Sequence, residues 1–183
     1  MKCRSGRVSD GGAPSVIRRL DASDATAFRD IRLAGLRDDP AAFGATFEEE
    51  AALPPAAFAD RLARNAVYGA EGPDGRLDGT CGLFVQDTAK LRHKGVVWGL
   101  FVRPEARGRG LGLALVRRVI AEAAGSVEEL RLAVGAGNLA ASRLYFRLGF
   151  RAHGREPRAM RVGGAYVDEV LMHLPPEAMV PPQ

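Results

Sequence analysis

The chain has 183 residues, which is enough for one domain with a hydrophobic core and short for two. Its 46% hydrophobic and 26% charged residues are typical of a soluble globular protein. The net charge of +4 favours anionic ligands, but the basic residues form no long run of the kind that indicates nucleic-acid binding. No segment approaches the roughly 20 apolar residues of a membrane helix. We therefore expect a single domain with neither a membrane nor a nucleic acid as its partner.

Cysteine and histidine usage argues against a metal site. Cys3 and Cys81 are too few for a disulfide framework or a four-ligand site, and the three histidines lack the spacing of metal ligands. The N-terminal residues are polar and glycine-rich, without the apolar stretch of a signal peptide. We expect a cytoplasmic protein without metal, with a flexible tail over 1–14, one domain over 15–175 and a C-terminal tail over 176–183.

The N-terminal third predicts one strand and two helices. Residues 16–20 form a short apolar strand candidate, and Ser23 is the predicted N-cap of a helix that runs to about residue 37. Asp38-Asp39-Pro40 ends this helix. A second helix is predicted to start near Pro54 and Pro55, because proline is favoured at the first helical position.

From residue 66 the apolar spacing becomes that of strands. Residues 66–71 and 77–87 flank Gly72-Pro73-Asp74-Gly75, which predicts a hairpin. Residues 95–102 are apolar nearly throughout, which is typical of a central strand that is covered on both faces.

The C-terminal half alternates helices and strands before it ends in a hairpin. We expect a helix over 110–124, a strand over 130–134, and a helix that Asn138 caps and that ends near residue 148. The last hairpin turns at Gly163-Gly164 and returns along 165–174. Hairpins early and late, with helices in the middle, indicate one α/β domain.

The stretch RPEARGRGLG (residues 103–112) lies between the central strand and a helix. A glycine-rich turn at a helix N-terminus is a recurring phosphate site, because free N–H groups and the helix dipole favour an anion. Glycine lets the ligand approach the backbone closely. Arg107 and Arg109 could add charge-assisted hydrogen bonds to phosphate oxygens.

The spacing of this loop separates three phosphate motifs. A P-loop needs lysine and then serine or threonine after its last glycine, whereas leucine and alanine follow Gly112. The dinucleotide pattern read from Gly108 needs a glycine at position 113, which is leucine. The pattern that fits is Arg-x-x-Gly-x-Gly, with Arg107, Gly110 and Gly112.

With this motif the sequence resembles the GNAT superfamily of N-acetyltransferases. The frame GLFVRPEARGRGLG (99–112) and the block NLAASRLYFRLGF (138–150) both follow the pattern of that family. The order of elements agrees from Val16 to Leu174. The resemblance implies an α/β (α+β) fold with a mixed, mostly antiparallel central sheet, a splayed parallel strand pair, and helices on both faces.

The resemblance also implies acetyl-CoA as cosubstrate. Its pantetheine arm would lie between the strands at 95–102 and 130–134, and a backbone N–H near Leu100–Val102 would face the thioester carbonyl. The cofactor-binding residues implied in this way are Leu100, Phe101, Val102, Arg107, Gly108, Arg109, Gly110, Leu111, Gly112, Asn138, Ala141 and Arg143.

The implied reaction is direct attack of a primary amine, of a small molecule or a peptide, on acetyl-CoA. The sequence has no Gly-x-Ser-x-Gly elbow, and Cys81 has no recognisable activating partner for an acyl-enzyme. Tyr145 matches the tyrosine that acts as general acid in many relatives. The alternative is a packing tyrosine with its hydroxyl near solvent.

The general base is where the sequence departs from the family pattern. Several relatives carry a glutamate on the strand before the glycine loop, but residues 96–102 contain no carboxylate. A lysine amine with a pKa of about 10.4 needs about 4 kcal/mol to lose its proton at neutral pH, whereas an α-amine near pKa 8 needs only about one pKa unit. Either the acceptor is a weakly basic amine, or a carboxylate from elsewhere acts. The candidates, each of which could equally be a solvated surface charge, are Glu48, Glu49, Glu50, Glu71, Asp168 and Glu169.

We expect residues 35–58 and 156–168 to recognise the acceptor. Four aromatic residues could line the pocket, or belong to the core: Trp98, Phe43, Phe47 and Tyr166. The alternatives to acetyl transfer are transfer of a longer acyl group and a non-catalytic acyl-CoA sensor. A homodimer is compatible with the sequence.

Overall fold

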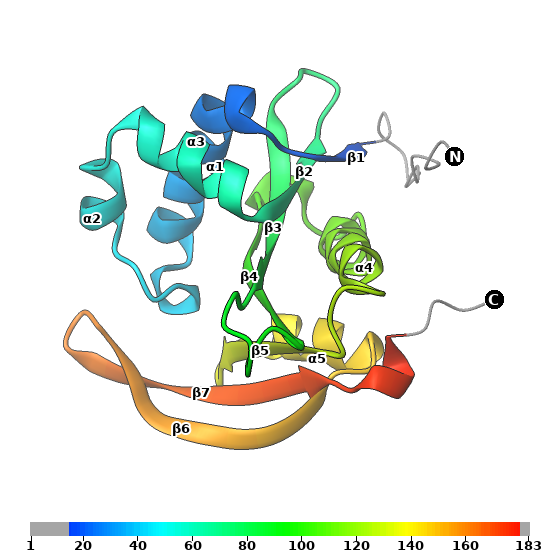
Figure 1. Ribbon diagram of the computed structural model, residues 1–183. Helices are drawn as coiled ribbons and strands as arrows, with labels where there is room; N and C mark the ends of the chain where they lie inside the picture. The colour runs from blue at the N-terminus through cyan, green and yellow to red at the C-terminus, as the bar shows by residue number, and fades with distance from the viewer. Residues whose placement is uncertain (1–14, 180–183) are drawn as a thin grey trace.

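A seven-stranded sheet organises the chain, with the strand order β1-β2-β3-β4-β5-β7-β6 (Figure 1). The computed structural model describes residues 15–179. All neighbouring strands are antiparallel except β4 and β5, which are parallel, as the sequence predicts. The strands are β1 (Val16–Arg19), β2 (Ala66–Glu71), β3 (Leu77–Val85), β4 (Lys94–Val102), β5 (Glu129–Gly135), β6 (Arg151–Val162) and β7 (Ala165–Leu174). The α-helices are α1 (Ala25–Asp38), α2 (Phe47–Ala51), α3 (Pro55–Arg64), α4 (Leu111–Ala123) and α5 (Leu139–Arg147).

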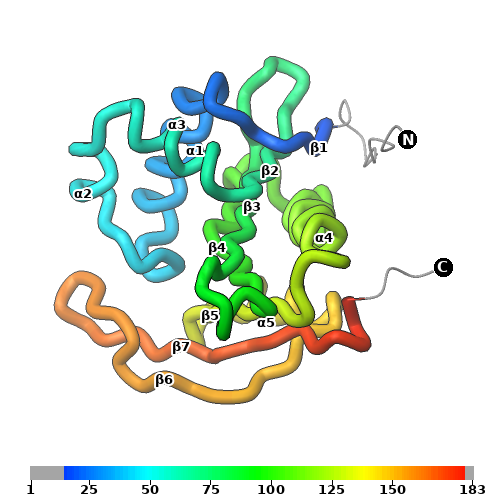
Figure 2. The backbone as a smooth tube through the Cα atoms, in the orientation of Figure 1, coloured from blue at the N-terminus to red at the C-terminus, as the bar shows by residue number. Residues whose placement is uncertain are grey.

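The sheet separates two hydrophobic cores. One core joins α4 and α5 to the sheet and includes Leu115 and Met172, both fully buried. The other joins α1 and α3 to the sheet and includes Phe28 and Phe58. Strand β4 contributes Val97 to the first core, and its other face belongs to the second, so the predicted coverage of this strand on both faces is confirmed. Figure 2 shows α1–α3 gathered beside the central strands, with α4 on the other side.

Two local predictions are corrected at the start of the domain. Ser23 is not the cap of α1, because a 3₁₀ turn (Ala22–Asp24) precedes the helix and Asp21 caps that turn by accepting a hydrogen bond from the Ser23 N–H. The short helix α2 was not predicted, although Thr46 and Glu49 form a capping box at its start.

The structure describes the C-terminal end of the chain further than the N-terminal end. The predicted tail over 1–14, with Cys3, lies outside the described residues. At the other end a 3₁₀ turn (Pro176–Ala178) follows β7, and Met179 packs into the core of α4 and α5. Within residues 15–179 no helix is long and apolar enough to cross a membrane.

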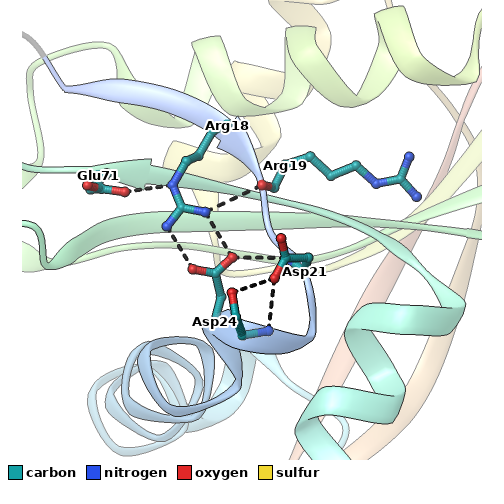
Figure 3. A network of polar contacts seen from close by, with 6 residues as sticks. Arg18, Arg19, Asp21, Asp24 and Glu71 are labelled. Carbon is teal, nitrogen blue, oxygen red and sulfur yellow. Dashed lines mark hydrogen bonds and ion pairs between the residues drawn. The ribbon is translucent and has the colours of Figure 1, made fainter.

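Arg18 ties the edge strand β1 to its neighbours (Figure 3). Its guanidinium donates two hydrogen bonds to the Asp24 carboxylate, at 2.7 and 2.8 Å, and one to Glu71 of β2 at 2.6 Å. These hydrogen bonds raise the pKa of Arg18 and hold the pKa of Asp24 below its usual value. Glu71 is therefore committed to a structural ion pair at the far edge of the sheet.

A second ion-pair cluster is buried between α1, α2 and α3. The Glu50 carboxylate accepts hydrogen bonds from Arg32 at 2.9 Å and from Arg61 at 2.9 Å. Burial opposes ionisation of Glu50, but the hydrogen bonds and charges of the two arginines outweigh it and lower its pKa. Because an unpaired charge is costly in a protein interior, the three residues fix the mutual arrangement of the helices.

We expect Glu50→Gln to lower the free energy of unfolding by about 3–5 kcal/mol at neutral pH, because it leaves two partly buried arginines without their carboxylate. The pKa of Glu50 is lowered in the folded state, so its contribution is present above the unfolded-state pKa and is lost as the pH falls through the folded-state value. Chemical denaturation should therefore show a difference that shrinks in acid. The exposed Glu48→Gln is the matched control, and equal stability of the two variants at neutral pH would contradict the prediction.

Candidate active site

The parallel strands β4 and β5 separate at the centre of the sheet. Their pairing ends at Val96 and Arg131, although β4 continues to residue 102 and β5 to residue 135. Beyond this point the facing edges of the two strands do not pair with each other, which confirms the predicted splayed pair. A buried backbone edge needs other hydrogen-bond partners, so the opening is suited to a ligand with amide groups.

A β-bulge lies on β4 beside this opening. Phe101 pairs with Thr80 and Trp98 pairs with Gly82, so Gly99 and Leu100 together lie opposite one residue of β3. Gly99 has φ +64°, the left-handed conformation that glycine adopts at the first position of such a bulge. The bulge redirects the backbone where the resemblance places the N–H that faces the thioester carbonyl.

The glycine loop presents a row of free backbone donors. None of the N–H groups of residues 108–113 donates a hydrogen bond to another described residue. The first helical hydrogen bond of α4 runs from the Ala114 N–H to the Gly110 carbonyl. Gly108 and Gly110 both have φ +78°, and a Cβ on Gly108 would meet open space. This geometry fits a diphosphate, which accepts several N–H hydrogen bonds at a helix N-terminus.

A cavity of about 570 Å³ joins the loop to the splayed strands. Eleven of the twelve predicted cofactor-binding residues line it, and Arg109 is the one that does not. Helical spacing could have found Leu144 and Arg147, which lie on the same side of α5 as Ala140. No local pattern points to Asp39, which reaches the cavity from the end of α1. Phe43, a predicted pocket residue, also lines this cavity. The lining residues that the sequence prediction lacked are Asp39, Ala42, Ala106, Leu113, Ala140, Leu144 and Arg147.

The charge of the cavity is positive, since three arginines and one aspartate line it. Arg107 donates one hydrogen bond to the Val102 carbonyl at 2.9 Å and another to Asp39 at 2.6 Å. Its guanidinium is therefore held at the mouth of the cavity by the end of α1. Arg143 and Arg147 supply the remaining positive charge from α5. An excess of positive charge favours an anionic ligand such as a diphosphate.

Tyr145 lies in the core of α4 and α5 rather than on the cavity wall. It is 7% exposed, and its ring packs edge-on against Phe150 at 5.6 Å. Burial raises the pKa of Tyr145, with a smaller contribution from Cys81, so the phenol stays protonated at neutral pH. Cys81 is the residue of β3 opposite the bulge, and burial raises the pKa of its thiol to about 12.

Several candidate bases are engaged elsewhere. Glu50 and Glu71 belong to the ion-pair clusters described above, and Glu49 caps α2. Asp168 accepts hydrogen bonds from the Arg158 N–H at 2.8 Å and from the Arg155 guanidinium at 2.6 Å, and these lower its pKa. Glu48 and Glu169 form no ion pair with a described residue.

A second cavity, of about 510 Å³, lies between the α1–α2 connection and the tip of the β6–β7 hairpin. Phe43 and Phe47 line it, as expected, and Phe43 also lines the first cavity. Trp98 packs instead against Phe28 in the core, and Tyr166 is half exposed with the Arg158 guanidinium 3.8 Å from its ring centroid. A volume of this size suits a small molecule.

Comparison with known proteins shows the family to which the chain belongs. The profile of the acetyltransferase (GNAT) family matches residues 33–150, more than half of the chain. The chain therefore belongs to the GNAT acetyltransferase family, and the predicted family is confirmed. Members of this family use acetyl-CoA as cosubstrate.

Individual relatives agree with this assignment. The L-methionine sulfoximine/L-methionine sulfone acetyltransferases of Pseudomonas aeruginosa and Pseudomonas paraeruginosa are 34% identical over 76 residues, which cover 41% of this chain and 44% of each relative. The fold is similar to that of a GNAT acetyltransferase from Streptococcus pneumoniae, with a TM-score of 0.77 and 22% identity over 87% of this chain and 98% of that one. A phosphinothricin acetyltransferase from Sinorhizobium meliloti, in complex with acetyl-CoA, gives a TM-score of 0.76 and 20% identity over 88% of each chain.

We expect Gly110→Ala to weaken acetyl-CoA binding by about tenfold or more, because a side chain in the left-handed conformation costs about 1–2 kcal/mol and the loop must rearrange to relieve it. Isothermal titration calorimetry measures the dissociation constant. Gly125→Ala is the matched control: Gly125 follows the other end of α4, has φ +85° and lies in open space. Equal loss of affinity in both variants would show that the effect is general destabilisation.

Proposed function

We propose that the chain is an N-acetyltransferase that transfers the acetyl group of acetyl-CoA to the primary amine of a small molecule. The observation that carries the proposal is the row of six unpaired N–H groups at residues 108–113, which opens directly into the splay between β4 and β5. A diphosphate on the loop would direct a pantetheine arm along the free strand edges toward the bulge at Gly99.

The chemistry of the proposed reaction is a direct displacement. The amine nitrogen forms a bond to the thioester carbon, the C–S bond breaks, and coenzyme A leaves as a thiol after it gains a proton. A backbone N–H at the β4 bulge would stabilise the negative charge that develops on the carbonyl oxygen. Cys81 is buried and stays a neutral thiol, which argues against an acyl-enzyme on this residue.

We propose that Tyr145 is the general acid, which donates a proton to the leaving thiolate of coenzyme A. Its phenol is protonated at neutral pH because burial raises its pKa. Tyr145 and Cys81 belong to the same hydrophobic core, and Cys81 is the residue of β3 opposite the bulge. A protonated phenol beside the leaving sulfur would supply the proton as the C–S bond breaks.

We propose the α-amino group of a free amino acid as the acceptor. The Pseudomonas relatives are named for two such acceptors. The cavity between the α1–α2 connection and the β6–β7 hairpin has room for a molecule of this size. An α-amine also loses its proton more easily than a lysine side chain, which suits a β4 strand without a carboxylate.

Tyr145→Phe should lower kcat by about 10²–10⁴-fold, the range of a lost general acid, while the dissociation constant of acetyl-CoA stays the same. The substitution keeps the ring that packs on Phe150, so the fold should be retained. Thiol release and calorimetry measure the two quantities. An unchanged kcat would assign Tyr145 to packing alone, and absence of turnover in the wild type with intact acetyl-CoA binding would indicate an acyl-CoA sensor.

In a panel of amines, free amino acids should be acetylated with a higher kcat/KM than the lysine side chain of an α-acetylated peptide, because the α-ammonium loses its proton more readily. The panel includes L-methionine sulfone, polyamines and peptide N-termini, and thiol release is followed across pH. A preference for the lysine side chain would reject the proposed acceptor and leave acetyl transfer itself in place.

A further inference from the structure

Glu169 lies close to the point where β4 and β5 separate. The last parallel pair of the two strands is Val96 and Arg131. Leu100 lies four residues beyond Val96 on β4, and Gly135 lies four residues beyond Arg131 on β5. Leu100 and Gly135 therefore lie at similar levels along the sheet. Gly135 is paired with Glu169 on the neighbouring strand β7. Glu169 is therefore one strand spacing, about 4.8 Å, beyond the β5 edge of the opening.

The side chain of Glu169 faces the acceptor side of the sheet. A Cβ on Gly135 would point toward the Ala41 carbonyl at 3.4 Å and the Val167 side chain at 3.7 Å. Directly paired residues of antiparallel strands share a face, and so do alternate residues of one strand, so Glu169 shares the face of Gly135 and Val167. The opposite face of β7 carries Met172 into the core of α4 and α5.

Glu169 is opposed by a second carboxylate. Glu156 of β6 is its direct partner in the antiparallel pairing, which places two like charges on one face. Such a pair destabilises a sheet. Burial raises the pKa of Glu169, and the negative charge of Glu156 raises it further. A carboxylate with a raised pKa is a better proton acceptor for an ammonium group.

Among residues 15–179, no arginine, lysine or histidine forms an ion pair with Glu169. On β5, the residues nearest to it on this face are Ala133 and Gly135, and the guanidinium of Arg131 is bound to Glu129 at 2.8 Å. Above the sheet, Asp39 at the end of α1 is paired with Arg107.

On the proposed function, we infer that Glu169 is the general base of the reaction and that Glu156 is a positioning residue that tunes it. The Glu169 carboxylate takes a proton from the acceptor ammonium, directly or through one water molecule. The nitrogen lone pair that is released forms the new bond to the thioester carbon. Of the six carboxylates that the sequence offers, Glu169 is the one that combines this face, this level and freedom from an ion pair. Glu48 is exposed, and the cavity that it lines extends toward the hairpin tip.

Glu169→Gln should lower kcat/KM by at least about 100-fold at neutral pH, with an unchanged dissociation constant for acetyl-CoA. The remaining activity should rise with pH up to the pKa of the acceptor amine, because only acceptor that is already deprotonated in solution can then react. Glu156→Gln should keep most of the activity and move the acidic limb to lower pH, since it removes one of the charges that raise the pKa of Glu169. Glu128→Gln removes an exposed charge just before β5, is the control for a lost surface charge, and should behave as the wild type.

The measurements use L-methionine sulfone as acceptor, thiol release as the readout, and calorimetry with acetyl-CoA to confirm folding. Glu169→Gln with the kcat/KM and pH profile of the wild type would overturn the inference and leave the proposed function intact. If Glu156→Gln leaves the acidic limb of the pH–rate profile unchanged, the proposed role of Glu156 in tuning Glu169 is rejected. A wild-type protein that binds acetyl-CoA but acetylates no amine would remove the proposed function and this inference together.

Discussion

The site depends on the interruption of pairing between β4 and β5. Parallel strands that continued in register past Val96 and Arg131 would satisfy their own backbone groups and leave no room for a ligand. Because they diverge, β4 keeps its pairing with β3 on one side and presents a free edge on the other. Helix α4 follows this strand after the glycine loop, so the N–H groups at its start and the free edge line one continuous cavity.

The two faces of the sheet contribute different parts of the site around this opening. The core of α4 and α5 holds the glycine loop and Tyr145 in place through buried apolar contacts. On the other face, the Arg32 guanidinium lies 3.9 Å from the point where a Cβ on Gly99 would be, and Glu50 fixes that arginine. The buried ion pairs of α1–α3 therefore order the wall beside the bulge. The β6–β7 hairpin completes this side and brings its own carboxylates to it.

The sequence predicted those features that depend on neighbouring residues. Asn138 accepts a hydrogen bond from the Ala141 N–H as predicted, and the turns at Gly75 and Gly163-Gly164 lie between the expected strands. Prediction failed where distant segments decide the outcome. Asp39 reaches the cavity only because α1 ends above β4 and β5. The sequence left open whether Trp98 lines a pocket or belongs to the core, and the helices of the second core decide this, because they cover its face of the sheet and bring Phe28 against it.

The sequence by itself determined the family, the glycine loop and the absence of a carboxylate on the strand before it, since each is a matter of residue type at fixed spacing. Only the tertiary structure decided where the other carboxylates lie. Asp168 and Glu169 are adjacent in the chain, yet one is bound by two arginines and the other is paired with Gly135 on the face of η2 (Pro40–Ala42). Successive side chains of a strand point to opposite faces, so strand register and the layers packed on each face set the surroundings of a charge.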